Sequence, residues 1–148
     1  MPTTSNIERE LVQQWYQARN QHDWSVIDDL LHDSFVFENI MLGITLSGRR
    51  EYLEYCRDFD NAFSDERLRL ERMISAPGGL FVVELTITGI QTGPFGVFPP
   101  SGEHVIMQFC DVLKLETGKV TNLRTYGDLY RPLSQMHHVV MQEKRPAA

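Results

Sequence analysis

The spacing of hydrophobic residues changes partway along the chain. In the first part, apolar side chains recur every three or four residues, as on an amphipathic helix. From about residue 67 they alternate with polar residues, as in a half-exposed strand. The pattern predicts helices from Ser5 to about Gln21, over 26–31 and over 49–62, a short strand at 35–37, and long strands over 67–75, 81–91, 103–116 and 120–129.

Helix-capping residues support these boundaries. Ser5 and Glu8 form an S-x-x-E capping box for the first helix. Asp23 or Ser25 can cap the second helix, and Ser47 can cap the third. Helices followed by long strands indicate an α+β fold. We expect one domain over 1–148, with its core at about 5–136 and a mobile polar tail at 137–148.

Composition narrows the range of partners. The formal net charge is −6, and the longest basic run is Arg49-Arg50. Binding to nucleic acid or to an acidic membrane surface requires a concentrated basic face, so we expect neither. The sequence contains no run of 18 apolar residues, so we expect no membrane span. Its first residues are polar and form no apolar signal segment, so we expect a cytoplasmic protein. Cys56 and Cys110 lack metal-ligand spacing, so we expect two reduced thiols.

An acidic residue falls on the inward face of one predicted strand. In the segment 107–115 the odd positions are Met, Phe, Asp, Leu and Leu, which places Asp111 among apolar neighbours. A buried carboxylate must be paired or neutral. Asp111 is therefore either a polar group of a pocket or one half of an ion pair with an arginine such as Arg124 or Arg69.

Several short motifs follow one another between Thr86 and Gln135. They are G-I-Q-T-G at 89–93, P-P-S-G at 99–102, the strand with an inserted Asp at 109–115, T-G-K-V at 117–120 and Y-G-D at 126–128. Their order resembles that in the SnoaL-like polyketide cyclases of the nuclear-transport-factor-2-like superfamily. The Trp15-Tyr16 pair, the N-Q-H-D turn at 20–23 and the helix start at Gly48 are also similar, so that the resemblance covers about 8–136.

The resemblance implies an α+β cone, in which three N-terminal helices pack in a curved antiparallel sheet and leave a deep pocket. It also implies a homodimer. The best-known chemistry of the family is aldol ring closure of polyketide esters without a metal or an organic cofactor, so we expect no cofactor.

Asp128 matches the position of the acid/base residue in these cyclases. Tyr126 and Arg124 precede it by two and four residues, so a regular strand directs all three side chains to one face. Two other interpretations remain open. Asp128 could cap the turn into 129–135, or it could be held in a salt bridge by Arg124.

Three further polar residues are candidates for the pocket. Gln91 stands where many family members have a histidine, and glutamine can orient a carbonyl or a water but cannot exchange protons at neutral pH. His104, just after the Pro-rich loop, is a second acid/base candidate at the pocket mouth or a surface group. Glu38 could lie on the pocket floor or on the surface. His137-His138 has no third ligand nearby in sequence, so we predict no metal site.

The aromatic residues Trp15, Tyr16 and Tyr55 are either core residues or a wall that contacts a flat hydrophobic ligand. The loop containing Phe95, Val97 and Phe98 is either a lid or part of a dimer interface. Three functional hypotheses follow. The first is a cofactor-independent cyclase or isomerase that acts on a carbonyl-activated hydrophobic small molecule, with Asp128 as general acid/base, supported by Asp111 and His104. The second is a non-catalytic, dimeric module that binds a small molecule or supports a partner protein. The third is a fold used mainly as a dimerisation unit.

Overall fold

The computed structural model describes residues 4–139, with side chains from Asn6 onward. The elements are α1 (Thr4–Asn20), α2 (Trp24–Leu30), β1 (Leu31–Asn39), β2 (Ile44–Ser47), α3 (Arg49–Ala62), β3 (Phe63–Ala76), β4 (Leu80–Gln91), β5 (His104–Glu116), β6 (Lys119–Gly127) and α4 (Tyr130–Gln135). The α+β class and the three N-terminal helices are confirmed.

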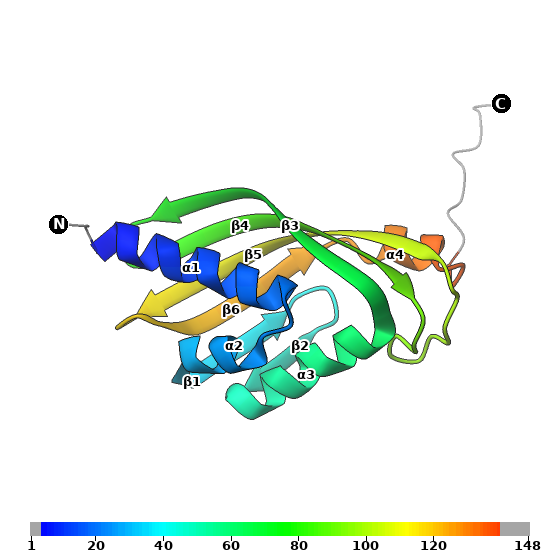
Figure 1. Ribbon diagram of the computed structural model, residues 1–148, viewed down its shortest axis with the longest axis horizontal. Coiled ribbons are helices and arrows are strands. Elements are labelled where there is room, and N and C mark those ends of the chain that lie inside the picture. Colours follow the sequence, from blue (N-terminus) through cyan, green and yellow to red (C-terminus); the bar gives the residue numbers. More distant parts are fainter. Residues whose placement is uncertain (1–3, 140–148) are drawn as a thin grey trace.

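The strands form one curved sheet of six strands in the order β2-β1-β6-β5-β4-β3 (Figure 1). The long strands β3 to β6 form an antiparallel meander, but β1 pairs with β6 in parallel. The expectation of an antiparallel sheet is therefore wrong at this one position. A parallel pair requires a long crossover connection, which the whole segment from β2 to β5 provides.

Helices α1 to α3 lie along the concave side of the sheet (Figure 1). The inward residues of β4 are the predicted ones, because Phe81, Val83, Leu85 and Ile87 are all buried. They pack with side chains from the helices and from β1, among them Val12, Trp15, Ile27, Phe35, Phe37 and Tyr52. This core fills most of the space between the helices and the sheet.

The helix caps are only partly as predicted. Asp23 caps α2, and its Oδ1 accepts a hydrogen bond from the Val26 backbone N–H at 3.4 Å. Ser47 does not cap α3. The residue before that helix is Gly48, at φ 95°, a conformation that side chains disfavour. The Ser5 capping side chain lies outside the described residues.

Two elements were not predicted, namely β2 and α4. Strand β2 is only four residues long and half exposed, so its pattern is too short to register. Helix α4 is only six residues long and contains Pro132 in its first turn, which conceals its pattern. Strand β3 also starts at Phe63, four residues earlier than expected, because its pairing with β4 continues beyond an irregularity between Ser64 and Arg67.

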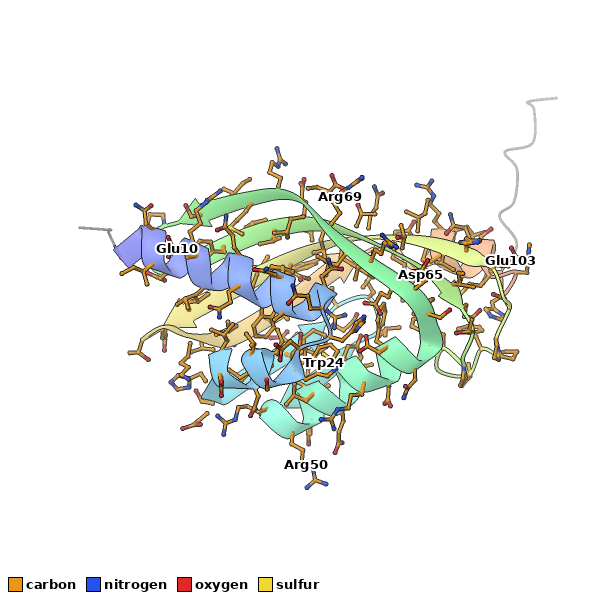
Figure 2. All side chains as sticks on the ribbon, in the orientation of Figure 1. Glu10, Trp24, Arg50, Asp65, Arg69 and Glu103 are labelled. Carbon is orange, nitrogen blue, oxygen red and sulfur yellow. The ribbon has the colours of Figure 1, made fainter. Side chains whose placement is uncertain are left out.

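The exterior is strongly charged (Figure 2), and Arg50, for example, extends away from α3 with 91% of its side chain exposed. No helix among residues 4–139 combines the length and the apolar character needed to cross a membrane. Of the predicted mobile tail, residues 140–148 lie outside the described residues. His138, near its start, stacks on Phe98 with ring centroids 4.8 Å apart.

Candidate active site

Three polar residues lie side by side on the inward face of the sheet. In the strand register, Asn39 of β1 is opposite Thr125 of β6, and Thr125 is opposite Asp111 of β5. The neighbouring inward row is apolar, because Phe37, Leu123 and Leu113 occupy the equivalent positions. The polar row thus interrupts an otherwise hydrophobic surface, where each polar group must find a partner.

Asp111 is the centre of this row. Its side chain is buried, with 6% of the residue exposed. The Tyr16 hydroxyl donates a hydrogen bond to Oδ2 at 2.6 Å, and the Thr125 hydroxyl donates one to Oδ1 at 2.7 Å. Neither predicted ion-pair partner is used, since Arg124 pairs with Glu38 and Arg69 pairs with Glu71. Asp111 is therefore a hydrogen-bonded carboxyl group inside the fold, as in the first of the two interpretations.

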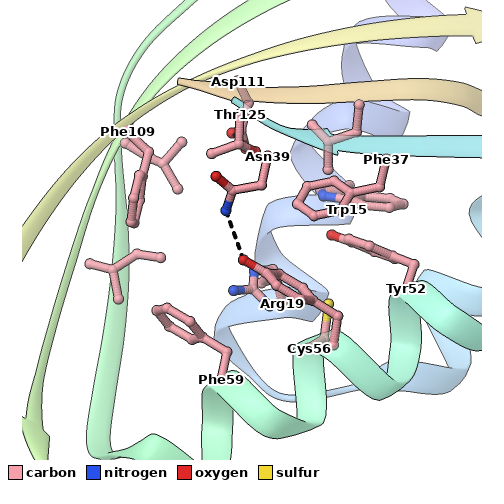
Figure 3. A pocket seen from close by; sticks show the side chains of 14 residues that line it. Trp15, Arg19, Phe37, Asn39, Tyr52, Cys56, Phe59, Phe109, Asp111 and Thr125 are labelled. Carbon is pink, nitrogen blue, oxygen red and sulfur yellow. Dashed lines mark hydrogen bonds between the residues drawn. The ribbon is translucent and has the colours of Figure 1, made fainter. Parts of the chain in front are cut away.

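Helices α1 and α3 form the opposite wall (Figure 3). Trp15 and Arg19 are one helical turn apart on α1. Tyr52, Tyr55, Cys56 and Phe59 follow the i, i+3, i+4, i+7 spacing on α3, so they project from one face. Together with the polar row and with Phe37, Leu85, Ile87, Phe109 and Leu123, they line a cavity of about 50 Å³. This volume holds about three or four water molecules, so the inner cavity accepts only a small group.

The inner cavity adjoins a wider, mostly apolar groove of about 620 Å³. Tyr55 and Phe59 line both spaces. The groove is also lined by Leu42, Ile44 and the loop 94–98, in which Val97 is 91% exposed. A ligand with a small polar end and a larger apolar body matches this combination of a narrow cavity and a wide groove.

The Asn39 and Tyr55 side chains provide hydrogen-bonding groups beside Asp111. The Asn39 amide Nδ2 donates to the Tyr55 hydroxyl oxygen at 2.9 Å, drawn as a dashed line in Figure 3. Because the Tyr55 oxygen accepts this bond, its own proton is available to a ligand. Burial raises the pKa of Tyr55, which keeps the hydroxyl protonated at neutral pH.

The environment of Asp111 changes its acidity in two opposing ways. Burial raises the pKa of Asp111, because the charged form loses hydration. The hydrogen bonds from Tyr16 and Thr125 and the positive charge of Arg19 lower the pKa, but by less than burial raises it. The net pKa is raised, so the carboxylate is a stronger base than a solvent-exposed aspartate.

Replacing Tyr16 by phenylalanine tests this balance. The change removes a hydrogen bond that favours the carboxylate, so the pKa of Asp111 rises further. Native Asp111 then holds its proton to higher pH than the unfolded chain does, and stability falls as pH rises from about 4 through the native pKa. We expect Tyr16→Phe to lose about 1–2 kcal/mol at pH 7 and less near pH 4, measured by urea unfolding. Tyr126→Phe, on the exposed face, is the control. An equal loss at both pH values would contradict the assignment.

Most of the other predicted site residues lie outside this cavity. Asp128 is exposed beyond the end of β6, where its Oδ1 accepts a hydrogen bond from the Tyr130 backbone N–H at 2.8 Å. Arg124 and Tyr126 point to the outer face of the sheet, and Arg124 pairs with Glu38 at 3.5 Å rather than with Asp128. Glu38 is thus an outer-face residue. The structure brings Asp111, Trp15 and Tyr55 to the cavity, with Tyr16 behind Asp111.

Gln91 and His104 also lie away from Asp111. Gln91 is fully buried and holds the loop after β4, since its Nε2 donates to the Pro99 carbonyl at 3.1 Å and its Oε1 accepts from the Ser101 N–H at 3.2 Å. At the position where many family members have a histidine, this chain therefore has a glutamine that holds the loop in place. His104 is exposed at the start of β5.

Sequence reasoning missed Asn39, Thr125 and Arg19 as cavity residues. Asn39 and Arg19 had a usable signal. Asn39 continues the inward alternation of Phe35 and Phe37, and Arg19 follows Trp15 at the inward helical spacing. A polar residue at an inward position is the informative exception in such a pattern.

One group among residues 4–139 has the geometry to hold a metal ion. The ligand atoms of His22, Asp60 and Glu66 lie within 4.8 Å of one another. His22 Nδ1 and Asp60 Oδ2 are already hydrogen-bonded at 2.9 Å, and the positive charge of Arg19 acts on Glu66. A nearby guanidinium opposes cation binding, so we describe this group as an acidic network behind the cavity.

Comparisons with known proteins agree with this architecture. A putative SnoaL-like polyketide cyclase from Jannaschia has a TM-score of 0.80 at 20% identity, covering 88% of this chain and 91% of that one. AclR, a putative hydroxylase from Streptomyces galilaeus, has a TM-score of 0.81 at 18% identity, covering 93% and 85%. An LEH-like epoxide hydrolase from M. tuberculosis has a TM-score of 0.69 at 21% identity, covering 88% and 90%. At these identities the likeness shows the fold.

No curated protein matches the sequence. The family model described as SnoaL-like polyketide cyclase matches residues 9–136, which is most of the chain. That match includes all the elements that form the cavity, from α1 to β6. The chain belongs to the SnoaL-like polyketide cyclase family of the nuclear-transport-factor-2-like superfamily.

Proposed function

We propose that this protein is a cofactor-independent enzyme of the cyclase or isomerase type, which moves a proton next to a carbonyl group of a small, largely apolar molecule. Asp111 is the general acid/base. The observation that supports this proposal is a buried carboxyl group with a raised pKa on the wall of a cavity. Family membership and the names of the structural neighbours, a cyclase and an epoxide hydrolase, agree with small-molecule chemistry.

The proposed step begins with Asp111 ionised. A carboxylate has about four acceptor positions, and the hydrogen bonds from Tyr16 and Thr125 use two of them. Another position remains for the proton of the activated carbon. As Asp111 takes that proton, the C–H electron pair moves into the carbon–carbon bond, and the carbonyl oxygen becomes an enolate oxygen.

The developing charge needs a donor that is already in place. We assign this role to the Tyr55 hydroxyl, which Asn39 orients through the 2.9 Å hydrogen bond. The enolate then either attacks a second carbonyl carbon or recovers the proton from Asp111 at another position. The first route closes a ring, and the second moves a double bond.

The apolar groove has its own part in this proposal. It would hold the body of the substrate beside Phe59 and Phe95, whose rings meet edge to face with centroids 6.4 Å apart. The inner cavity of about 50 Å³ would admit only the small polar end of the substrate, which carries the reacting carbonyl. The substrate is therefore a molecule with its activated group at one end.

Exchange of hydrogen for deuterium tests the chemistry without knowledge of the final product. The protein is incubated in D₂O with a panel of 1,3-dicarbonyl compounds that carry an apolar substituent, and loss of the α-proton signal is followed by NMR. We expect exchange of at least one compound to exceed the buffer rate by about a hundredfold or more. Binding of these compounds without faster exchange favours the second hypothesis, a non-catalytic binding module.

A further inference from the structure

Among the described residues, the charged group of Arg19 has neither a salt bridge nor a hydrogen bond to its buried Nη1. The residue is largely enclosed, its Nη1 is buried, and this atom has no hydrogen-bond partner among the described residues. The salt bridges of the described residues do not include one between Arg19 and a carboxylate, although Glu66 and Asp60 act on its charge from a greater distance. A buried cation without hydrogen bonds is costly, and such an atom in a native structure requires an explanation.

The surroundings hold the guanidinium in a defined position. Its central carbon lies 5.7 Å from the ring centroid of Trp24 and 5.5 Å from that of Phe59. Both distances are in the range of cation–π contacts. Arg19 is also one of the residues that line the inner cavity, as Figure 3 shows. The donor group is therefore fixed by aromatic rings beside the space that a ligand would enter.

The nearest acidic groups do not neutralise Arg19 by contact. Asp60 uses its Oδ2 in the hydrogen bond with His22, and its buried Oδ1 has no hydrogen-bond partner, so Asp60 acts on Arg19 only through its charge at a distance. Burial is the main cause that raises the pKa of Glu66 to about 7, so this group is partly protonated near neutral pH. Asp111 is occupied by Tyr16 and Thr125. The donors of Arg19 remain available for an anion that comes from outside.

We propose that Arg19 binds a carboxylate group of the substrate, so that the substrate class is a small carboxylic acid with an apolar body. The guanidinium presents several N–H donors in a planar fork that matches a carboxylate. The inner cavity has room for a group of this size, and the groove past Tyr55 and Phe59 accepts the apolar body. This inference rests on the proposed function in taking the cavity as the substrate site, but its test measures binding alone.

The two tryptophans of the chain provide the measurement, because Trp15 lines the cavity and Trp24 contacts Arg19. The protein is titrated with 4-phenylbutyrate and, separately, with its neutral amide, 4-phenylbutanamide, while tryptophan fluorescence is recorded. The two probes differ only in the charged end. We expect wild type to bind the acid at least about tenfold more tightly, because a charge-assisted hydrogen bond is about twice as strong as a neutral one.

Two variants identify the source of that preference. Arg19→Met keeps the apolar stem and removes the charge, so the acid-to-amide affinity ratio should fall to about one. Arg19→Lys keeps a charge but loses the planar fork, so the ratio should be intermediate, and it serves if the methionine variant does not fold. Equal affinity of wild type for both probes, or a ratio that neither variant changes, overturns the proposal.

The same titration on Asp111→Asn separates the anion site from the enzymatic proposal, which the deuterium exchange tests. This variant should prefer the acid at least as strongly as wild type, since Arg19 is unchanged and the negative charge of Asp111 is removed from the cavity wall. A preserved preference together with no deuterium exchange in wild type leaves the anion site standing and rejects the enzyme. Exchange by wild type without any preference for the acid rejects the anion site and leaves the enzyme standing.

Discussion

Asp111→Asn is expected to lower the rate of α-proton exchange by about 10²–10⁴-fold, the usual contribution of a general acid/base. Asparagine has nearly the same shape as aspartate but cannot take up a proton at neutral pH. It can also satisfy its two neighbours, because its Oδ1 accepts from Tyr16 and its Nδ2 donates to the oxygen of Thr125. The loss would therefore come from the chemistry and leave the fold in place.

The same variant should be at least as stable as wild type at pH 7. Burial raises the pKa of Asp111, so the native state binds more protons than the unfolded chain, and stability decreases as pH rises from about 4 to the native pKa. A neutral asparagine does not titrate in this range, so the variant avoids this decrease in stability. Urea unfolding at pH 4 and pH 7 would measure it, and a large loss of stability at pH 7 would contradict our account of Asp111.

Asp128→Asn is the matched control, because it makes the same chemical change on an exposed carboxylate outside the cavity. We expect it to keep the exchange rate within about twofold. If Asp128→Asn abolishes exchange and Asp111→Asn does not, the acid/base group is the one that the family resemblance implies, and the assignment to Asp111 is wrong.

Trp15→Ala should cause the largest loss of stability, about 3–5 kcal/mol, as is usual for a buried aromatic residue replaced by alanine. Trp15 is 1% exposed. Its ring centroid lies 5.9 Å from that of Tyr52, on which it stacks, and 6.5 Å from that of Phe35. Removing the indole enlarges a cavity whose aromatic walls cannot collapse completely. Urea unfolding followed by circular dichroism would measure the change.

Trp24→Ala is the control for Trp15, since Trp24 is only partly buried at the start of α2. We expect it to lose less than half as much stability. A loss below about 1 kcal/mol for Trp15→Ala would mean that the site relaxes around the missing side chain, and that Trp15 does not support the cavity wall.

Local patterns predicted most of the fold. The alternation in β4 placed Phe81 and Ile87 on the buried face, and the same reasoning placed Asp111 inside. The boundaries of α3 also agree with the prediction. These features depend on residues close in sequence, so a period of two or 3.6 is enough to detect them.

The site itself depends on pairings that periodicity does not report. That Asn39 faces Thr125 follows from the parallel contact of β1 with β6, which no local pattern signals. The family resemblance directed attention to Asp128, yet the chain turns after Gly127, and Asp128 is left on the surface. Helical spacing placed Arg19 on the same face as Trp15, but spacing does not show whether the guanidinium at the end of a long side chain reaches solvent or a cavity.

The parallel pairing of β1 with β6 has a consequence for how the protein is made. β1 leaves the ribosome early and can pair with β2 at once, but its other partner, β6, is the last strand to be made, so this second contact has a high contact order and closes a long loop. During synthesis the cavity lacks one wall until Thr125 has emerged and inserted between Asn39 and Asp111. Until then Asn39 and Asp111 lie on the uncovered edges of two separate strands, where their polar side chains are solvated, which reduces the tendency of the nascent chain to aggregate.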